Sequence, residues 1–216
     1  MLAGPALAIP DANGNITSTP APDISADSAM SARLNYNLGA ETFEKTQAAE
    51  KQSATLAGAK AKAALKATMA GYRDARARFE AAVKADPDLK EGWNLIGYTS
   101  RRLGEYDKSL AAYEKALALN PVYPEAIEYR AEACLALNRL DDAKAAYVAL
   151  SGLSPPHAGV LMQSLQNWVV AHRKRAGGVS TADIDAFATW VDERAKVAQQ
   201  TTAMRLDSVT FRGWNQ

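Results

Sequence analysis

The residues that could carry out chemistry in this chain are few and scattered. The two histidines, His157 and His172, have no cluster of carboxylates around them in the sequence. Because metal and acid–base sites need several such groups together, we expect both histidines on the surface. The single cysteine, Cys134, cannot form an internal disulfide, and its place on an expected helix predicts a buried structural thiol. Asp141 and Asp142 precede an expected helix, where acidic side chains suit the helix dipole.

Larger catalytic patterns are also missing from the sequence. It contains no glycine-rich phosphate loop, no His-Glu-x-x-His, no Cys-x-x-Cys and no Gly-x-Ser-x-Gly. We therefore predict that the protein is not an enzyme and that it has no catalytic residues, no bound metal and no cofactor.

Charge and composition exclude further classes of protein. The 216 residues carry 25 Lys and Arg against 24 Asp and Glu, a net charge of +1, so we expect no nucleic-acid partner. No apolar run approaches the ~20 residues that a membrane span needs. The 45 alanines favour helix packed closely on helix.

Residue types recur at a period of 34 through the middle of the chain. The rows are Pro87, Pro121 and Pro155; Phe79, Tyr113 and Tyr147; Ala75, Ser109 and Ala143; Ala82, Ala116 and Leu150; and Tyr72, Tyr106 and Leu140. In the clearest unit, residues 90–123, Trp93 and Gly97 share one helical face. Gly104 then supplies a turn, and Pro121 stops the second helix.

This unit resembles a tetratricopeptide repeat, a helix-turn-helix motif of 34 residues. The resemblance covers residues 56–157 and implies an all-α fold: a short helical solenoid of about three helix-turn-helix units with flanking helices. The unit at 124–157 departs further from the pattern, with Ile127 at the Trp place and Asn138 in the turn. The first unit matches only in its second half, because its first helix, residues 56–69, is rich in Ala and Lys.

Helices are expected on both sides of the repeats. Residues 30–68 predict one long helix or a helix pair, which would cap the array or serve as a free arm for self-association. Within it, residues 36–39 resemble the first helix of a further repeat, but no second helix follows at the right distance. Residues 158–216 predict capping helices at about 157–174 and 182–204, with a capping box at Ser180–Asp183. They end in an aromatic tail, Phe211 and Trp214, that should pack on the body.

The N-terminus resembles the end of a signal peptide. Ala6-Leu7-Ala8 has the small-x-small form of a cleavage site, and Ile9 would begin the mature chain. Residues 1–8 are therefore expected to be a signal remnant, followed by a disordered tail over 9–29. This predicts a periplasmic or otherwise exported protein; without a signal remnant, the location would be cytoplasmic.

The resemblance implies a peptide-binding concave surface lined by the first helix of each repeat. The residues on this face are Glu91, Asn94, Tyr98, Arg101, Arg102, Glu125, Glu128 and Glu132. Asn94 and the two arginines could hold a peptide backbone or carboxylate, while the glutamates of the second repeat would repel a carboxylate. The family's clamp for acidic C-terminal tails is not matched, because Tyr98 and Glu132 stand where it needs Asn, Lys or Arg. A merely solvated charged face remains the alternative.

Together these patterns favour a non-enzymatic protein–protein interaction module, an adaptor or assembly factor with an unknown protein or peptide partner. The alternative is a structural protein that associates with itself through the N-terminal helix.

Overall fold

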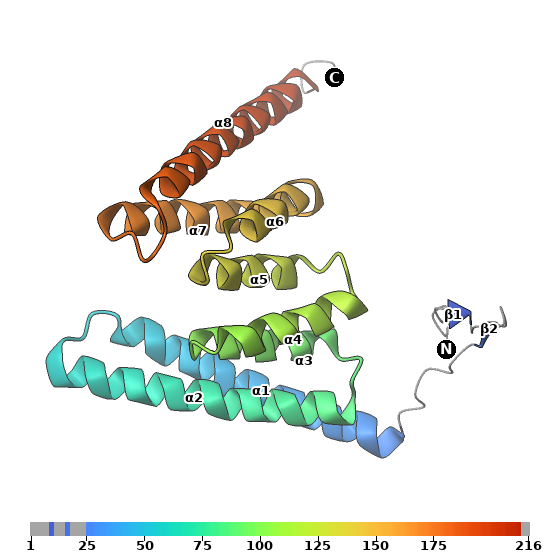
Figure 1. Ribbon diagram of the computed structural model, residues 1–216. Helices are drawn as coiled ribbons and strands as arrows, with labels where there is room; N and C mark the ends of the chain where they lie inside the picture. Colours follow the sequence, from blue (N-terminus) through green and yellow to red (C-terminus); the bar gives the residue numbers. More distant parts are fainter. Residues whose placement is uncertain (1–8, 11–15, 18–24, 213–216) are drawn as a thin grey trace.

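The computed structural model describes residues 9–10, 16–17 and 25–212, with side chains described over 25–201 (Figure 1). The expected signal remnant, Trp214 and the Phe211 side chain lie outside these residues. Two short strands, β1 (Ile9–Pro10) and β2 (Ile16–Thr17), pair antiparallel. This pairing, and a first helix that begins at Ala26, differ from the disordered tail expected over residues 9–29.

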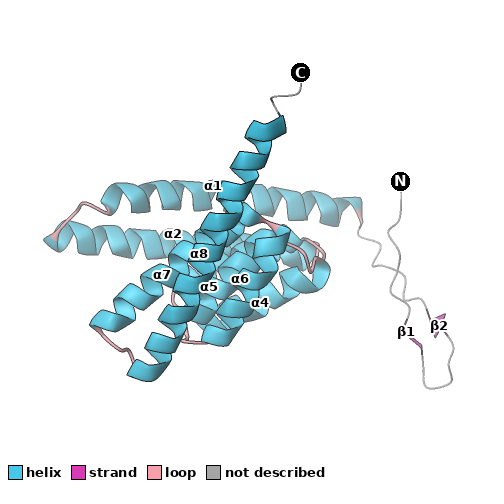
Figure 2. Ribbon diagram, turned by 90° about the horizontal axis from the view of Figure 1, so that it is seen from above, coloured by secondary structure: helices cyan, strands magenta, loops and turns pink. Residues whose placement is uncertain are grey.

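The rest of the described chain is helical, as the all-α prediction requires. The helices are α1 (Ala26–Ser53), α2 (Gly58–Ala85), α3 (Lys90–Arg102), α4 (Tyr106–Leu119), α5 (Pro124–Ala136), α6 (Leu140–Leu153), α7 (Pro155–Lys174) and α8 (Thr181–Arg212). Each helix packs on the next, and α5 also packs on α3 and α7. The helices therefore stack as a solenoid of pairs (Figures 1 and 2).

The repeat rows have clear packing roles in the α3–α4 pair. A Cβ atom added to Gly97 would lie 2.5 Å from the Tyr113 ring, so only glycine lets α4 approach this closely. The Ser109 hydroxyl donates to the Gly97 carbonyl at 2.8 Å and fixes the same crossing. The helix ends also repeat, because Gly104 (φ 78°) and Asn138 (φ 57°) both adopt the left-handed conformation that ends α3 and α5.

The first repeat is built differently from the expectation. Residues 56–69 do not form a separate first helix, because they belong to α2, which runs unbroken to Ala85. The first helix of this unit is α1, where Gly39 approaches the Phe79 ring as Gly97 approaches Tyr113. Gly39 and Phe79 are 40 positions apart, whereas Gly97 and Tyr113 are 16 apart, so the first repeat carries 24 additional residues.

These additional residues lengthen the closed end of the α1–α2 hairpin. Contacts from the hairpin to α3 include the Gln47–Tyr98 hydrogen bond, the Glu50–Arg102 ion pair and the Arg76–Ser100 hydrogen bond. Residues 51–71 lie beyond these contacts, and Figure 2 shows the closed end reaching away from the stacked helices. We call residues 51–71 the arm.

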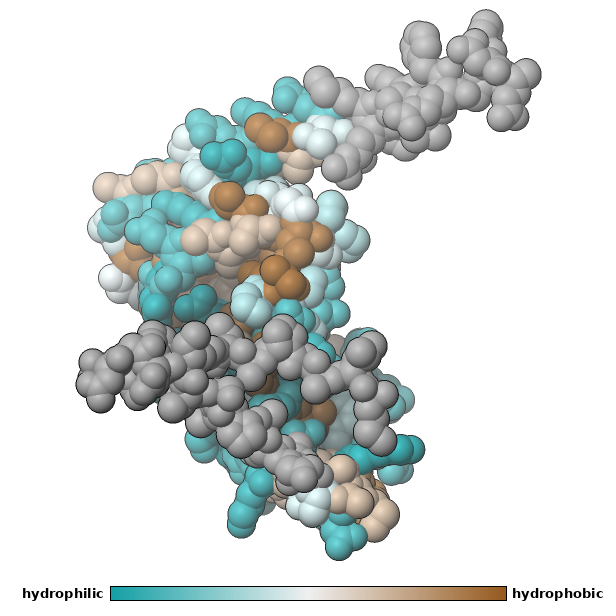
Figure 3. All heavy atoms as spheres, turned by 90° about the vertical axis from the view of Figure 1, so that its right-hand side faces the viewer, coloured by the Kyte–Doolittle hydropathy of each residue, from teal (hydrophilic) through white to brown (hydrophobic). Residues whose placement is uncertain are grey.

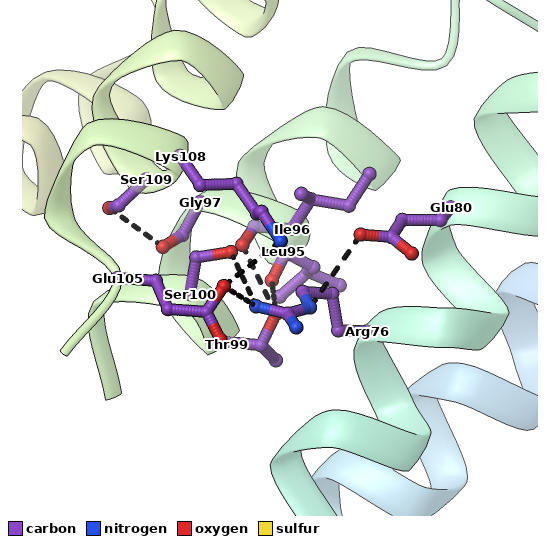
Figure 4. A network of polar contacts seen from close by, with 10 residues as sticks. All are labelled: Arg76, Glu80, Leu95, Ile96, Gly97, Thr99, Ser100, Glu105, Lys108 and Ser109. Carbon is purple, nitrogen blue, oxygen red and sulfur yellow. Dashed lines mark hydrogen bonds and ion pairs between the residues drawn. The ribbon is translucent and has the colours of Figure 1, made fainter. Parts of the chain in front are cut away.

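A polar network joins α2 to the α3–α4 pair (Figure 4). The Arg76 guanidinium donates to Glu105 Oε2 at 2.7 Å and to Ser100 Oγ at 3.3 Å, and it lies 3.6 Å from Glu80. Lys108 also reaches Glu105, at 3.0 Å. The Arg76 side chain is largely buried, whereas Glu105 is partly exposed. Their ion pair holds the turn between α3 and α4 against the first repeat.

The helices α7 and α8 follow α6 at the C-terminal end of the stack, and α8 extends further than the expected residue 204. The Trp168 indole donates to the Leu135 carbonyl at 3.0 Å, and its ring meets Phe187 edge-on at 5.0 Å. The predicted cap at Ser180 is present, since its hydroxyl accepts the Asp183 N–H at 3.1 Å.

Candidate protein-binding surface

One face of the solenoid is formed by the first helices of successive pairs, α1, α3, α5 and α7, and we call it the inner face. Tyr98 lies at its centre. The Tyr98 hydroxyl accepts a hydrogen bond from Gln47 Nε2 at 3.0 Å, and its ring lies 5.0 Å from both Phe43 and Tyr129. A row of partly buried aromatic rings therefore joins α1, α3 and α5.

Arg101 is held in place from three sides. Its guanidinium lies over the rings of Tyr98 (5.1 Å) and Tyr129 (5.8 Å) and forms an ion pair with Glu132 at 2.7 Å. Burial alone would lower the pKa of Arg101, but the Glu132 carboxylate raises it above its usual value. Glu132 also accepts a hydrogen bond from Ser164 of α7 at 2.8 Å, so α3, α5 and α7 are linked through the Glu132 carboxylate.

Arg102 is also neutralised, in this case by the first repeat. It pairs with Glu50, which accepts a second hydrogen bond from the Tyr72 hydroxyl at 2.8 Å. Burial, and next the hydrogen bond to Glu50, raise the pKa of Tyr72. With Arg101 and Arg102 both paired to carboxylates, a peptide carboxylate would meet two cations whose charges are already compensated.

Glu128 is a buried carboxylate on the inner face, with only 4% of its surface exposed. His157, at the start of α7, lies 2.6 Å from Glu128 through Nδ1 and 3.7 Å from Glu125 through Nε2. Burial raises the pKa of Glu128, and the hydrogen bond with His157 only partly opposes this. The sequence placed His157 on the surface; the structure makes it a partner of two of the candidate glutamates.

The remaining candidates lie near the N-terminal end of α3. Glu91 is partly exposed and pairs with Lys90 at 2.5 Å. Burial would raise the pKa of Glu91, but the hydrogen bond from Lys90 lowers it. Asn94 is 4% exposed, and its Oδ1 atom has no hydrogen-bond partner among the described residues. Tyr123 lies close by, and burial, followed by the charges of Glu125 and Glu91, raises its pKa to about 12.

Six of the eight candidates thus form three groups, and the other two, Glu91 and Asn94, lie near the N-terminal end of α3. Tyr98, Arg101 and Glu132 lie together at the centre, Glu125 and Glu128 meet at His157, and Arg102 turns to Glu50. Sequence reasoning missed His157, Glu50 and Ser164. The Pro155-Pro156 pair that starts α7 places His157 in its first turn, and this was the signal available for that residue. That these residues bind a partner stays a prediction.

The other reactive residues have structural surroundings. Cys134 is buried, as expected, and burial raises the pKa of its thiol. His172 stacks on Trp168 with the ring centroids 3.8 Å apart, which differs from the expected simple surface position. Within the described ranges, His, Cys, Asp and Glu nowhere gather in a group of three that could hold a metal ion. The same residues include no helix long and apolar enough to cross a membrane.

Apolar side chains also reach the surface near the C-terminal helices. Val148 of α6, Val160 of α7 and Val197 of α8 are each more than half exposed. Figure 3 shows the side of the molecule at the right of Figure 1, where apolar surface gathers in the upper half, at the level of these helices. A cleft of about 490 Å³ lies between α6, α7 and α8, with Met162 and Arg194 among its lining residues.

Comparison with known proteins identifies one segment of the chain. Residues 91–123 match the family model of the tetratricopeptide repeat, whereas no curated protein matches the sequence. The first TPR domain of Spaghetti (RPAP3) bound to an HSP90 peptide is similar, with a TM-score of 0.49 and 20% identity over 64% of this chain and 94% of that one. MamA is similar with a TM-score of 0.46 and 18% identity, over 65% and 80%. YrrB, a TPR protein with an unusual peptide-binding site, is similar with a TM-score of 0.43 and 17% identity, over 83% and 92%. The family match therefore supports a tetratricopeptide repeat at residues 91–123, the α3–α4 unit.

Proposed function

We propose that the chain is a non-enzymatic adaptor or assembly factor that binds a partner protein or peptide along the inner face. A tetratricopeptide repeat supports a protein-interaction module of this general kind. The observation that carries the proposal is the buried polar content of this face. Glu128 and Asn94 are each 4% exposed, and Asn94 Oδ1 has no hydrogen-bond partner in the part of the chain that the structure describes.

Buried polar groups of this kind lower the stability of a surface that has only a structural role. Burying a charge or an unpaired amide oxygen lowers stability by roughly 1–3 kcal/mol relative to a satisfied or apolar group. Polar groups held in fixed positions are, however, what a binding face needs in order to hydrogen-bond an extended peptide. The linked contacts of Tyr98, Arg101 and Glu132 hold this face in shape before a partner arrives.

The proposal is tested by photo-crosslinking in cells. A crosslinking amino acid replaces Glu125, which is partly exposed on the inner face, and in a matched strain it replaces Glu114, which is exposed on α4. We expect one dominant foreign adduct at position 125, absent at 114 and reduced at least about fivefold by Glu91→Lys, because that change reverses a charge on the same face. Adducts with the chain itself alone, or equal adducts at both positions, would contradict the proposal.

Self-association through the α1–α2 hairpin is the second candidate, and the 24-residue lengthening of the first repeat is the observation that favours it. Its test is molar mass by light scattering over a wide range of protein concentration. A mass that rises with concentration and falls on removal of the arm supports this candidate, whereas a constant monomer mass refutes it.

We also infer export, from Ala6-Leu7-Ala8. N-terminal sequencing of the protein from its native cells supports export if Ile9 comes first and contradicts it if Met1 is retained.

A further inference from the structure

We propose that the arm, residues 51–71 at the closed end of the α1–α2 hairpin, docks onto an anionic phospholipid surface. This inference goes beyond the proposed function, because the arm and the inner face are different surfaces. The 24 additional residues that create the arm are not needed to complete the repeat, since α1 and α2 already meet at Gly39 and Phe79. The additional length of the arm therefore needs an explanation other than completion of the repeat.

The arm carries an excess of positive charge. It contains four lysines, Lys51, Lys60, Lys62 and Lys66, and no Asp or Glu. The arm therefore has a net charge of +4, whereas the whole chain has only +1, so the rest of the chain carries −3. None of the four takes part in an ion pair between described residues, unlike Lys45 and Lys90 in the same part of the fold. The arm is thus an uncompensated positive end.

These cations lie on more than one side of the hairpin. Lys62 and Lys66 are one turn apart on α2, where like charges repel each other. Lys60 is two positions from Lys62 and so faces nearly the opposite side of the helix. Lys51 reaches the same end from the last turn of α1. Positive charge therefore surrounds the end of the hairpin instead of forming a single stripe.

The apex of the hairpin exposes apolar side chains. Leu56 lies in the connection between α1 and α2 and is 42% exposed, and Leu65 farther along the arm is 60% exposed. Ala54, Ala57 and Ala59 beside Leu56 are exposed as well. An apolar apex ringed by lysines suits a lipid surface, because the apex can enter the headgroup layer while the ammonium groups meet the phosphates.

The same features argue against the other polyanions. Proteins that bind single-stranded nucleic acids use aromatic and arginine side chains to stack on bases, and the arm has neither residue type. An acidic partner helix would be met by cations along one stripe, whereas Lys60 and Lys62 face opposite sides. The α2 part of the arm, residues 58–71, is about 20 Å long at about 1.5 Å per residue. Figure 2 shows this closed end reaching away from the stacked helices, so it can meet a planar surface before they do.

The experiment is sedimentation of the full chain with lipid vesicles. The vesicles are neutral phosphatidylcholine, alone or with about 30 mol% phosphatidylglycerol, because only the anionic lipid should bind the arm. We expect at least about tenfold more bound protein on the anionic vesicles, with the gain lost near 0.5 M salt. The triple variant Lys60→Glu, Lys62→Glu, Lys66→Glu should lose this gain.

A matched control separates the arm from overall charge. The variant Arg33→Glu, Lys115→Glu, Lys196→Glu changes the net charge equally at three exposed sites without ion pairs to described residues. It should keep most of the binding, and helicity measured by circular dichroism should be unchanged in both variants. Equal loss of binding in the two variants would overturn the proposal.

A fluorescent reporter tests whether the apex enters the lipid. An environment-sensitive dye is attached to Leu56→Cys, and in a control to Val148→Cys on exposed α6; the buried native Cys134 is shielded from the label. A blue shift on anionic vesicles at position 56 and not at 148 supports the proposal. No shift at 56, or preferential binding to duplex DNA or polyglutamate, overturns it. Because the arm and the inner face are different surfaces, failure of the lipid experiments would leave the expected crosslinking at the inner face unchanged.

Discussion

At the scale of single residues, Glu128 shows that the inner face is kept at a cost in stability. Because burial raises the pKa of Glu128, the carboxyl favours folding when it is protonated. This favourable contribution is present below the unfolded pKa, near 4.5, and is lost as the pH rises through the higher folded value. Above the folded pKa, the ionised group therefore makes the fold less stable than a neutral one would.

Glu128→Gln should accordingly stabilise the protein at pH 7, by about 0.5–1.5 kcal/mol, since the amide can still hydrogen-bond His157 without a buried charge. The free energy of unfolding, measured by denaturant titration at pH 7 and at pH 4, should show the gain shrinking at the lower pH. Glu125→Gln is the control: this partly exposed carboxylate should change stability little at either pH. A loss of stability in Glu128→Gln at pH 7 would show that the His157 pair is worth more than the burial of its charge costs.

The candidate residues could be named from the sequence, but their pairing could not. Arg101, Glu132 and Glu128 were identified by helical spacing, which gives the face of a helix. Their partners come from other helices: Ser164 is 32 positions from Glu132, and Glu50 is 52 from Arg102. Spacing within one helix carries no information about such contacts, so two arginines that looked free are in fact neutralised.

Two glycines provide a residue-scale test of how close the helices pack. Gly97→Ala should destabilise the fold by about 1–3 kcal/mol, because its Cβ would lie 2.5 Å from the Tyr113 ring. Gly159→Ala within α7 meets nothing within 4 Å and should instead stabilise it, by about 0.5–1 kcal/mol, through helix propensity. Thermal unfolding of the two variants checks both signs; similar shifts in the same direction would refute the packing argument.

At the scale of elements, the 34-residue period predicted α3 to α6 closely and failed at the first repeat. The turns at Gly104 and Asn138 and the stops after α4 and α6 follow the repeat rows. The resemblance of residues 36–39 to a repeat helix was visible, but its second helix lies 24 residues later than the period allows. A search at a fixed period cannot detect a repeat that contains an insertion. Residues 56–69 were therefore predicted to be the first helix of this unit, in place of α1.

This explanation predicts that the arm can be removed without loss of the fold. Deletion of residues 48–71 restores the normal spacing, and Thr46→Gly supplies the left-handed turn that Gly104 supplies in the next repeat. We expect a folded, cooperatively melting protein whose helix content falls only by the deleted segment, because the Gln47–Tyr98 and Arg76–Ser100 contacts to α3 remain, although the Glu50–Arg102 ion pair is lost. Circular dichroism and thermal unfolding measure this. A variant that does not fold would mean that the arm belongs to the core of the first repeat.

At the scale of the whole molecule, the solenoid has no single centre. One cluster of buried apolar residues joins α1 to α4, a second lies at α4 and α5, and a third joins α5 to α8. In such a stack each unit contacts only its neighbours, so stability is a sum of local terms and the ends can open first. The ion pairs of Arg101 and Arg102 join these clusters along the inner face only.

Phe187→Ala should therefore open one end of the molecule and leave the other closed. It removes the ring that packs on Trp168, a truncation worth about 3–5 kcal/mol in a core. Because α8 has no further helix beyond it in the described chain, that loss should appear as faster hydrogen exchange in α7 and α8. The amides of α2 to α4 should keep their protection. Val148→Ala, at an exposed α6 position, should leave exchange unchanged. Uniform loss of protection from α2 to α8 would instead show that the stack unfolds as one cooperative unit, so that a partner bound anywhere on the inner face would stabilise every helix equally.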